Sequence, residues 1–124
     1  MFEITSALGR VLDALSVRQS VLSDNIANVN TPGFKRSDVD FREVARQAFA
    51  ELEKTSPHRG QRASQGPIRV VQDRTSSMRN DGNNVDIERE MVLLEETALR
   101  YNTIAEYVSR RLRDLRTVID AGRR

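Results

Sequence analysis

The sequence predicts an all-α fold built on one long helix at each end of the chain. In both terminal segments apolar residues recur about every 3.5 residues, which is the spacing of a coiled-coil seam. The segment between them is mostly polar and contains Gly and Pro, apart from one short amphipathic stretch. Only 38% of the 124 residues are apolar, so the long helices need partners, in the chain or in an assembly, to bury enough apolar surface.

The first helix is expected over residues 1–30. Two polar residues, Arg18 and Asn25, interrupt its apolar seam. Gly9 costs about 1 kcal/mol relative to Ala inside a helix, which predicts either local softness or the close approach of another helix. The seam itself consists of Met1, Ile4, Leu8, Val11, Leu15, Leu22 and Val29.

The motif NIANVNTPGFK, residues 25–35, ends this helix. Thr31 precedes a proline and is therefore pushed out of the α conformation. Pro32 and Gly33 suit the two central positions of a type II turn, because Gly accepts a positive φ. Phe34 then follows as an apolar anchor.

The asparagines of this motif need a separate explanation. The motif's asparagines, Asn28 and Asn30 among them, can cap carbonyl groups at the helix end. Asn25 lies inside the helix on the seam, where a polar side chain costs stability unless it has a partner. We therefore expect Asn25 and Asn28 to fix the register between the terminal helices or between subunits.

The middle of the chain, residues 31–84, is expected to contain the turn, one short helix and a flexible loop. The loop covers residues 55–83, has little apolar content and allows at most a short strand at 68–71. The short helix is expected over 41–54, with an apolar face made of Phe41, Val44, Ala45, Ala48, Phe49 and Leu52.

The last helix is expected over residues 85–122. Asn83 and Asn84 favour a turn before it, Asp86 suits the N-cap and Gly122 suits the stop. The helix would be about 54 Å long at 1.5 Å per residue. Its seam advances in alternating steps of four and three and consists of Ile87, Met91, Leu94, Ala98, Tyr101, Ala105, Val108, Leu112, Leu115 and Ile119.

Two arrangements of these helices are compatible with the residues alone. The terminal helices can close into an antiparallel hairpin, or they can form a three-helix bundle with residues 41–54. Tyr101, Ile104 and Tyr107 make the apolar stripe of the last helix wider than one partner requires. A further partner for that helix is therefore expected in either arrangement.

Residues that could support catalysis or bind a metal are sparse. The chain has no Cys, which excludes disulfides and thiolate metal sites, and His58 is its single histidine. The basic loop lacks the stacking aromatic residues typical of nucleic-acid binders. We therefore expect no enzyme, no cofactor, no metal and no nucleic-acid partner. We also expect no membrane span and no cleaved secretory signal.

Three segments resemble the bacterial flagellar axial proteins, the family of rod, hook and hook-associated subunits. They are VLSDNIANVNTPGFK at 21–35, SDVDF at 37–41 and the long run from DGNNVDIE at 81 to the isoleucine at 119. Within this family the chain is similar to the proximal rod subunits, on VDF at 39–41, its short length and its Arg- and Leu-rich end. Another rod protein such as FlgC shares the motifs in outline and is one alternative.

The resemblance implies a structural subunit that is exported by the flagellar type III apparatus without a cleaved signal and polymerises helically into the periplasmic rod. Its implied partners are other copies of itself, FlgC-like rod proteins, a FliE-like adaptor, the membrane-ring base and the export apparatus. The family's terminal helices pair as an antiparallel coiled coil. The motif and seam residues named above are then the expected assembly residues. The alternative from another class is a cytoplasmic helical adaptor or export chaperone, which would be a folded, soluble dimer.

Overall fold

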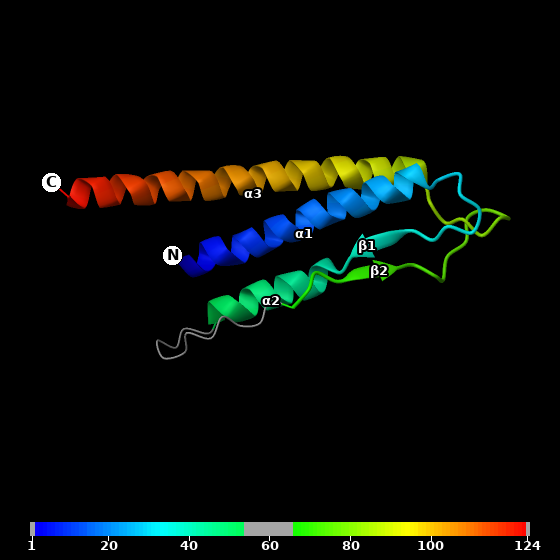
Figure 1. Ribbon diagram of the computed structural model, residues 1–124, viewed down its shortest axis with the longest axis horizontal. Helices are drawn as coiled ribbons and strands as arrows, with labels where there is room; N and C mark the ends of the chain where they lie inside the picture. The colour runs from blue at the N-terminus through cyan, green and yellow to red at the C-terminus, as the bar shows by residue number, and fades with distance from the viewer. Residues whose placement is uncertain (1, 54–65, 124) are drawn as a thin grey trace.

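The two long helices lie side by side and run in opposite directions in the computed structural model of the chain (Figure 1). The structure describes residues 2–53 and 66–123, so the predictions for Met1 and His58 lie outside the described residues. The elements in order are α1 (Phe2–Ala27), β1 (Ser37–Val39), α2 (Phe41–Glu53), β2 (Val70–Gln72) and α3 (Ile87–Gly122).

α1 forms the middle layer of the molecule, with α3 along one side and α2 and the two strands along the other (Figure 1). The core between α1, β1 and α2 is small. In the described part of the chain, α2 and α3 each contact α1 but not one another. The helices therefore form a hairpin with a side layer and not a three-helix bundle. The core residues are Ala14, Val39 and Val44, against which Val17, Phe41 and Ile68 pack.

The prediction of an all-α fold is wrong in one respect, because β1 and β2 form a two-stranded antiparallel sheet. Asp38 lies opposite Val71, and the pairing continues beyond both strands, where the Asp40 amide donates to the Arg69 carbonyl at 2.9 Å. Each strand has only three residues, too few for an alternating pattern to stand out. All three residues of β2 are exposed, so backbone pairing rather than apolar burial holds this strand.

The apolar face expected for residues 41–54 is narrower in the structure. Val44 and Ala48 are buried against α1, whereas Phe49 is 66% exposed. In the described part of the chain α2 contacts no helix other than α1, so only one side of its apolar face is covered. Phe49 is therefore not part of the core.

α3 faces α1 with a different set of residues from the expected seam. Half of the expected seam does face α1. These residues are half-buried: Leu94, Tyr101, Val108 and Leu115. A second line of residues on α3 also faces α1, and it begins at Glu90 and not at Met91. The expected seam residues Met91, Leu112, Ile119 and Ile87 are therefore 43–54% exposed. Polar residues occupy part of this line, and a pattern of apolar residues cannot reveal them. The line consists of Glu90, Thr97, Ile104 and Arg111.

Gly9 sits in the interior of α1, but no other helix approaches it closely. A Cβ added to Gly9 would meet no atom within 4 Å, so the expected close contact is wrong.

Gly9→Ala should raise the free energy of unfolding by about 0.5–1 kcal/mol, because Ala loses less backbone entropy in a helix. Urea unfolding followed by circular dichroism measures this. Gly33→Ala is the matched control with the opposite expected sign, since Gly33 has φ of 71°. A loss of stability in Gly9→Ala would contradict the open space around this position.

Candidate functional site

The chain leaves α1 through the predicted turn at Thr31–Phe34. The Phe34 amide donates to the Thr31 carbonyl at 3.2 Å, and Gly33 has φ of 71°, as in a type II turn. The Gly33 amide also donates to the Asp81 carbonyl at 2.9 Å. Gly82 has φ of 82°, and a Cβ on it would lie 3.8 Å from the Cα of Gly33. Two glycine turns, far apart in sequence, therefore lie against each other beside the end of α1.

Asn83 binds the turn that follows α1, although it lies more than 50 residues later in the chain. Its side-chain amide donates to the carbonyls of Asn28, Val29 and Thr31 at 3.1, 3.1 and 2.8 Å. Its side-chain oxygen accepts from the Val85 amide at 2.7 Å. Asn83 is fully buried, so all of its hydrogen-bonding capacity is used inside the protein. Asn83 therefore ties the loop before α3 to the end of α1.

Asn28 makes the predicted cap at the end of α1. Its side-chain amide donates to the Asp24 carbonyl at 2.8 Å, one turn back in its own helix, and its side-chain oxygen accepts from the Thr31 hydroxyl at 3.1 Å. Within the described part of the chain both of these side-chain bonds are local. The side chain of Asn30 is exposed.

Asn84 holds the start of β1 against the loop that follows β2. Its side-chain oxygen accepts from the Arg36 amide at 2.6 Å, and its amide donates to the Asp73 carbonyl at 2.9 Å and the Ser76 hydroxyl at 3.1 Å. Asp86 then begins α3, where its carboxylate accepts from the amides of Glu88 and Arg89. The predicted N-cap is confirmed by this geometry.

Asn25 connects α1 with both β1 and α3. Its side chain forms a pair of hydrogen bonds with the backbone of Ser37, donating to the carbonyl at 2.7 Å and accepting from the amide at 3.0 Å. The same side-chain amide donates to Glu90 at 3.1 Å. Asn25 is 1% exposed. A polar residue on the apolar seam therefore has its partners, and one of them lies on α3.

Glu90 is the centre of a partly buried set of polar and charged side chains that we call the polar junction, made of Arg18, Asn25, Arg36, Asp38 and Glu90. One oxygen of Glu90 accepts from the Arg36 guanidinium and the other accepts from Asn25. Arg36 also lies 3.5 Å from Asp38, which accepts two hydrogen bonds from Arg18 at 2.9 and 3.0 Å. The side chain of Glu90 is 0% exposed. The chain of contacts joins α1, β1 and α3.

The neighbours of Asp38 and Arg36 in the polar junction stabilise the ionised forms of these two side chains. Burial alone would raise the pKa of Asp38. The hydrogen bonds from Arg18 and the Val39 amide, together with the charges of Arg18 and Arg36, outweigh it and lower that pKa below its ordinary value of 3.8. Burial would likewise lower the pKa of Arg36, but its hydrogen bond to Glu90 raises the pKa above the ordinary value.

The structure brings together the two asparagine-rich motifs that the sequence singles out, through Asn25, Asn83 and Asn84. It does not bring the seam residues of α3 to this point, because they extend along the whole helix. Sequence reasoning missed Arg36, Asp38 and Glu90 as members of the junction. Arg18 and Asn25 carried a signal, since they are the two polar interruptions of the first seam. No comparable signal marked Glu90, which looks like an ordinary acidic residue in the first turns of a helix.

The polar junction is suited to holding elements together and not to chemistry. Its side-chain groups are engaged with other protein groups, apart from the buried Arg36 Nη2, which has no hydrogen-bond partner in the described part of the chain and lies 3.5 Å from Asp38. Among the described residues the junction therefore offers no free nucleophile or base. Over residues 2–53 and 66–123, no group of three or more His, Cys, Asp or Glu side chains could hold a metal ion. None of the helices described in these ranges is long and apolar enough to cross a membrane.

Comparison with known proteins identifies the family. A family model described as flagella basal body rod protein matches residues 8–35, which include the end of α1 and its turn. The FlgB protein of Borreliella burgdorferi is 34% identical over 122 residues, covering 89% of this chain and 90% of the relative. The chain belongs to the FlgB family of flagellar basal body rod proteins. The FlgB proteins of Borrelia hermsii and Bacillus subtilis are 38% and 28% identical, covering 96% and 94% of this chain and 98% and 92% of those relatives.

Membership of the FlgB family assigns the role. The chain is a structural subunit of the flagellar basal-body rod and not an enzyme, and it works in the basal body together with other rod components. Arg18, Asn25 and Gly33 lie in the segment that the family model matches, and Arg36 and Asp38 follow it closely. Glu90 and Gly82 lie outside the matched segment.

The junction predicts a large effect for one asparagine and a small effect for its neighbour. Asn25→Ala leaves the backbone groups of Ser37 and one oxygen of Glu90 without their partner, and should lower the free energy of unfolding by about 2–4 kcal/mol. Asn28→Ala removes only a local bond near water and should cost about 1 kcal/mol or less. Equilibrium unfolding in urea compares the two variants. Equal losses would contradict a special role for Asn25.

The lowered pKa of Asp38 predicts a specific loss of stability in acid. Because the folded-state pKa lies below the unfolded value, ionised Asp38 contributes stability that is fully present above that value. The contribution is lost as the pH falls through the folded-state pKa. The free energy of unfolding of the unmodified chain should fall more steeply below about pH 4 than that of Asp38→Asn. Thermal melts across this range measure the two slopes, and parallel curves would contradict the assignment.

Proposed function

We propose that this chain is a proximal subunit of the flagellar rod that is exported by the flagellar type III apparatus without a cleaved signal and polymerises helically in the periplasm. The single observation that carries the proposal is the amount of apolar surface that α3 leaves uncovered. Such surface is typical of a subunit that completes its packing in an assembly. FlgB relatives of nearly the same length support the proximal position.

α3 is longer than its partner inside the chain. It has 36 residues against 26 in α1, and its last turns extend beyond the first residue of α1 (Figure 1). Val118 and Ile119 lie in this extension and are 69% and 54% exposed. Leu112, near its start, is 50% exposed. A second helix from a neighbouring subunit is the natural cover for these residues, because only an apolar partner removes them from water.

We propose that α1 and α3 pair as a coiled coil and that residues 1–30 and 85–122 form one assembly unit, with 31–84 as its side segment. The half-buried and buried positions of α3 advance in steps of four and three, which supports this geometry. Beyond Leu115 the apolar residues Val118 and Ile119 are exposed, so the same coiled coil can continue there with a helix of the next subunit. The seam and motif residues named from the sequence would then act in assembly.

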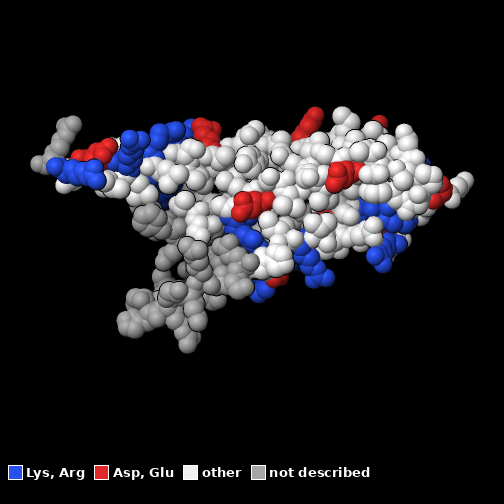
Figure 2. All heavy atoms as spheres, viewed as in Figure 1, with Lys and Arg blue, Asp and Glu red and all other residues white. Residues whose placement is uncertain are grey.

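The proposed partners are other copies of the chain, FlgC-like rod proteins, a FliE-like adaptor, the membrane-ring base and the export apparatus. The distribution of charge supports contacts at the C-terminal end of the elongated subunit, since basic side chains gather over the last turns of α3 (Figure 2). They include Arg110, Arg113, Arg116 and Arg123, which are exposed. The absence of cysteine suits export, because no disulfide can form before assembly.

Leu112→Asp separates assembly from folding. Leu112 is 50% exposed, so the change should alter the free energy of unfolding of the free chain by no more than about 0.5 kcal/mol. In the rod the same carboxylate would be buried without a partner. We expect export to continue while rod assembly and swimming fail, measured by secretion assays, basal-body preparation and motility.

Thr117→Asp is the matched control, because Thr117 is exposed on another face of the same end of α3. It should assemble and swim like the unmodified chain. Normal swimming with Leu112→Asp would show that this face stays in water and would remove the support for the proposal. A soluble, folded oligomer that never enters a rod would favour the adaptor instead.

A further inference from the structure

α3 carries an apolar line that the rest of the chain covers only in part. We call it the free line; it is formed by every seventh residue, Met91, Ala98, Ala105, Leu112 and Ile119. Met91, Leu112 and Ile119 are 50–54% exposed, and the two alanines are half-buried. The free line lies next to the half-buried line that starts at Leu94, because residues three apart are neighbours on a helix. It is a continuous apolar edge beside the existing contact with α1.

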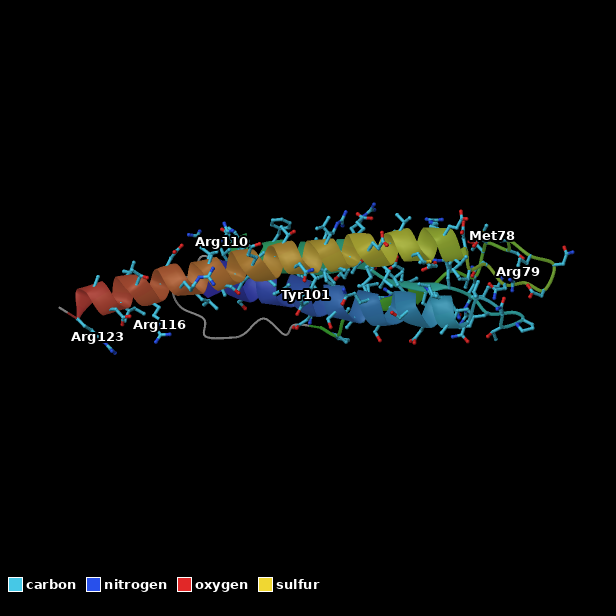
Figure 3. All side chains as sticks on the ribbon, turned by 90° about the horizontal axis from the view of Figure 1, so that it is seen from above. Met78, Arg79, Tyr101, Arg110, Arg116 and Arg123 are labelled. Atoms are coloured by element: carbon cyan, nitrogen blue, oxygen red, sulfur yellow. The ribbon has the colours of Figure 1, made fainter. Side chains whose placement is uncertain are left out.

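A second line flanks the free line on its other side and carries charge of opposite sign at its two ends. We call it the charged line; its members are Glu88, Glu95, Asn102, Ser109, Arg116 and Arg123, and all are exposed. Residues four apart are neighbours on the opposite side from those three apart, which places Glu95 beside Met91. Figure 3 shows Arg116 and Arg123 on one side of α3 and Arg110 on another.

The charges of this line have no ion-pair partner in the part of the chain that the structure describes. Other charges of α3 do have one, since Arg100 pairs with Glu96, and Arg110 pairs with Glu106 at 2.5 Å. The acidic and basic ends of the charged line are therefore left for a group outside the chain.

We infer that the free line and the charged line form one self-complementary surface, on which a second copy of the chain docks with its α3 antiparallel to the first. If Ala105 of one copy faces Ala105 of the other, Met91 faces Ile119 and Ala98 faces Leu112. A large side chain then lies opposite a small one next to the centre. The overlap extends along the whole of α3, about 54 Å.

The same register pairs the charges. In this arrangement Glu88 lies opposite Arg123, Glu95 lies opposite Arg116 and Asn102 lies opposite Ser109, within one residue of the register set by Ala105. Each pair occurs twice, because the contact has a two-fold axis. Opposite charges beside an apolar contact fix its direction and exclude other registers.

Other arrangements of two copies fit less well. In a parallel pair in register, Glu88 would face Glu88 and Arg116 would face Arg116, which is repulsive. A parallel pair shifted by four heptads would match Glu88 with Arg116, but only the ends of the helices would overlap. The antiparallel pair alone matches both lines over their full length.

A two-fold contact closes on itself and cannot continue into a filament. The pair is thus a state of the chain outside the rod, in which two copies cover each other's free line until rod partners take their place. The inference does not depend on the proposed position in the rod, since it concerns the purified chain.

The chain contains no cysteine, so single-cysteine variants give a clean test. Ala105→Cys lies on the proposed two-fold axis and should form a disulfide-linked dimer under mild oxidation. The matched control is Ser109→Cys, whose two copies would be about 12 Å apart along the helices, too far for a disulfide. A mixture of Met91→Cys and Ile119→Cys chains should form the mixed dimer, while each variant alone should stay uncrosslinked.

Charge reversal tests the direction of pairing independently of the thiols. Glu88→Arg with Glu95→Arg should weaken dimerisation by about tenfold or more in sedimentation equilibrium. Adding Arg116→Glu and Arg123→Glu to the same chain should restore it.

The antiparallel pair is overturned if the chain stays monomeric, if Met91→Cys self-links as readily as Ala105→Cys, or if the fourfold reversal does not restore the dimer. A monomeric chain that enters the rod normally would overturn this inference and leave the proposed function intact. A chain that dimerises as described but never enters the rod would support this inference and overturn the proposed function.

Discussion

The contact between Glu90 and its two partners is the constraint on which the rest of this structure depends. A carboxylate taken wholly out of water costs several kcal/mol unless other groups replace the water. Here Asn25 of α1 and Arg36, directly before β1, replace it. α1, the start of β1 and α3 must therefore meet at one point. Once they meet, the position of α1 along α3 is set, and the apolar contacts further along the two helices follow from it.

The sequence predicted the features that depend on neighbouring residues. The three helices, the turn at Pro32 and Gly33 and the N-cap at Asp86 all follow from local propensities, and the structure contains them. The small sheet could not be predicted in the same way, because its two strands are separated by α2 and hold together through backbone pairing. The inward line of α3 was also missed, since Glu90 is polar and its partners lie more than 50 residues away.

The candidate site likewise combines features that the sequence predicted with contacts that it could not predict. Both asparagine-rich motifs stood out in the sequence, yet nothing in either motif states that Asn83 reaches back to the first one. The surplus of apolar residues on α3 was visible from the start, and the structure explains it. α1 covers only part of the stripe, and the remainder stays exposed in the single chain. In the proposed function this remainder serves the contacts with other subunits.

The contact of Asn83 with the turn after α1 has a consequence for the order of folding. The carbonyl groups of Asn28, Val29 and Thr31 accept from a side chain 52 to 55 residues later in the chain. Closing so long a loop costs entropy before the contact returns any free energy. An N-terminal segment that is made or threaded first can therefore complete α1, whose last carbonyls are paired locally, while the turn behind it still lacks this donor. The turn after α1 therefore stays flexible while only the first part of the chain is available. It becomes rigid only when the segment that contains Asn83 binds it.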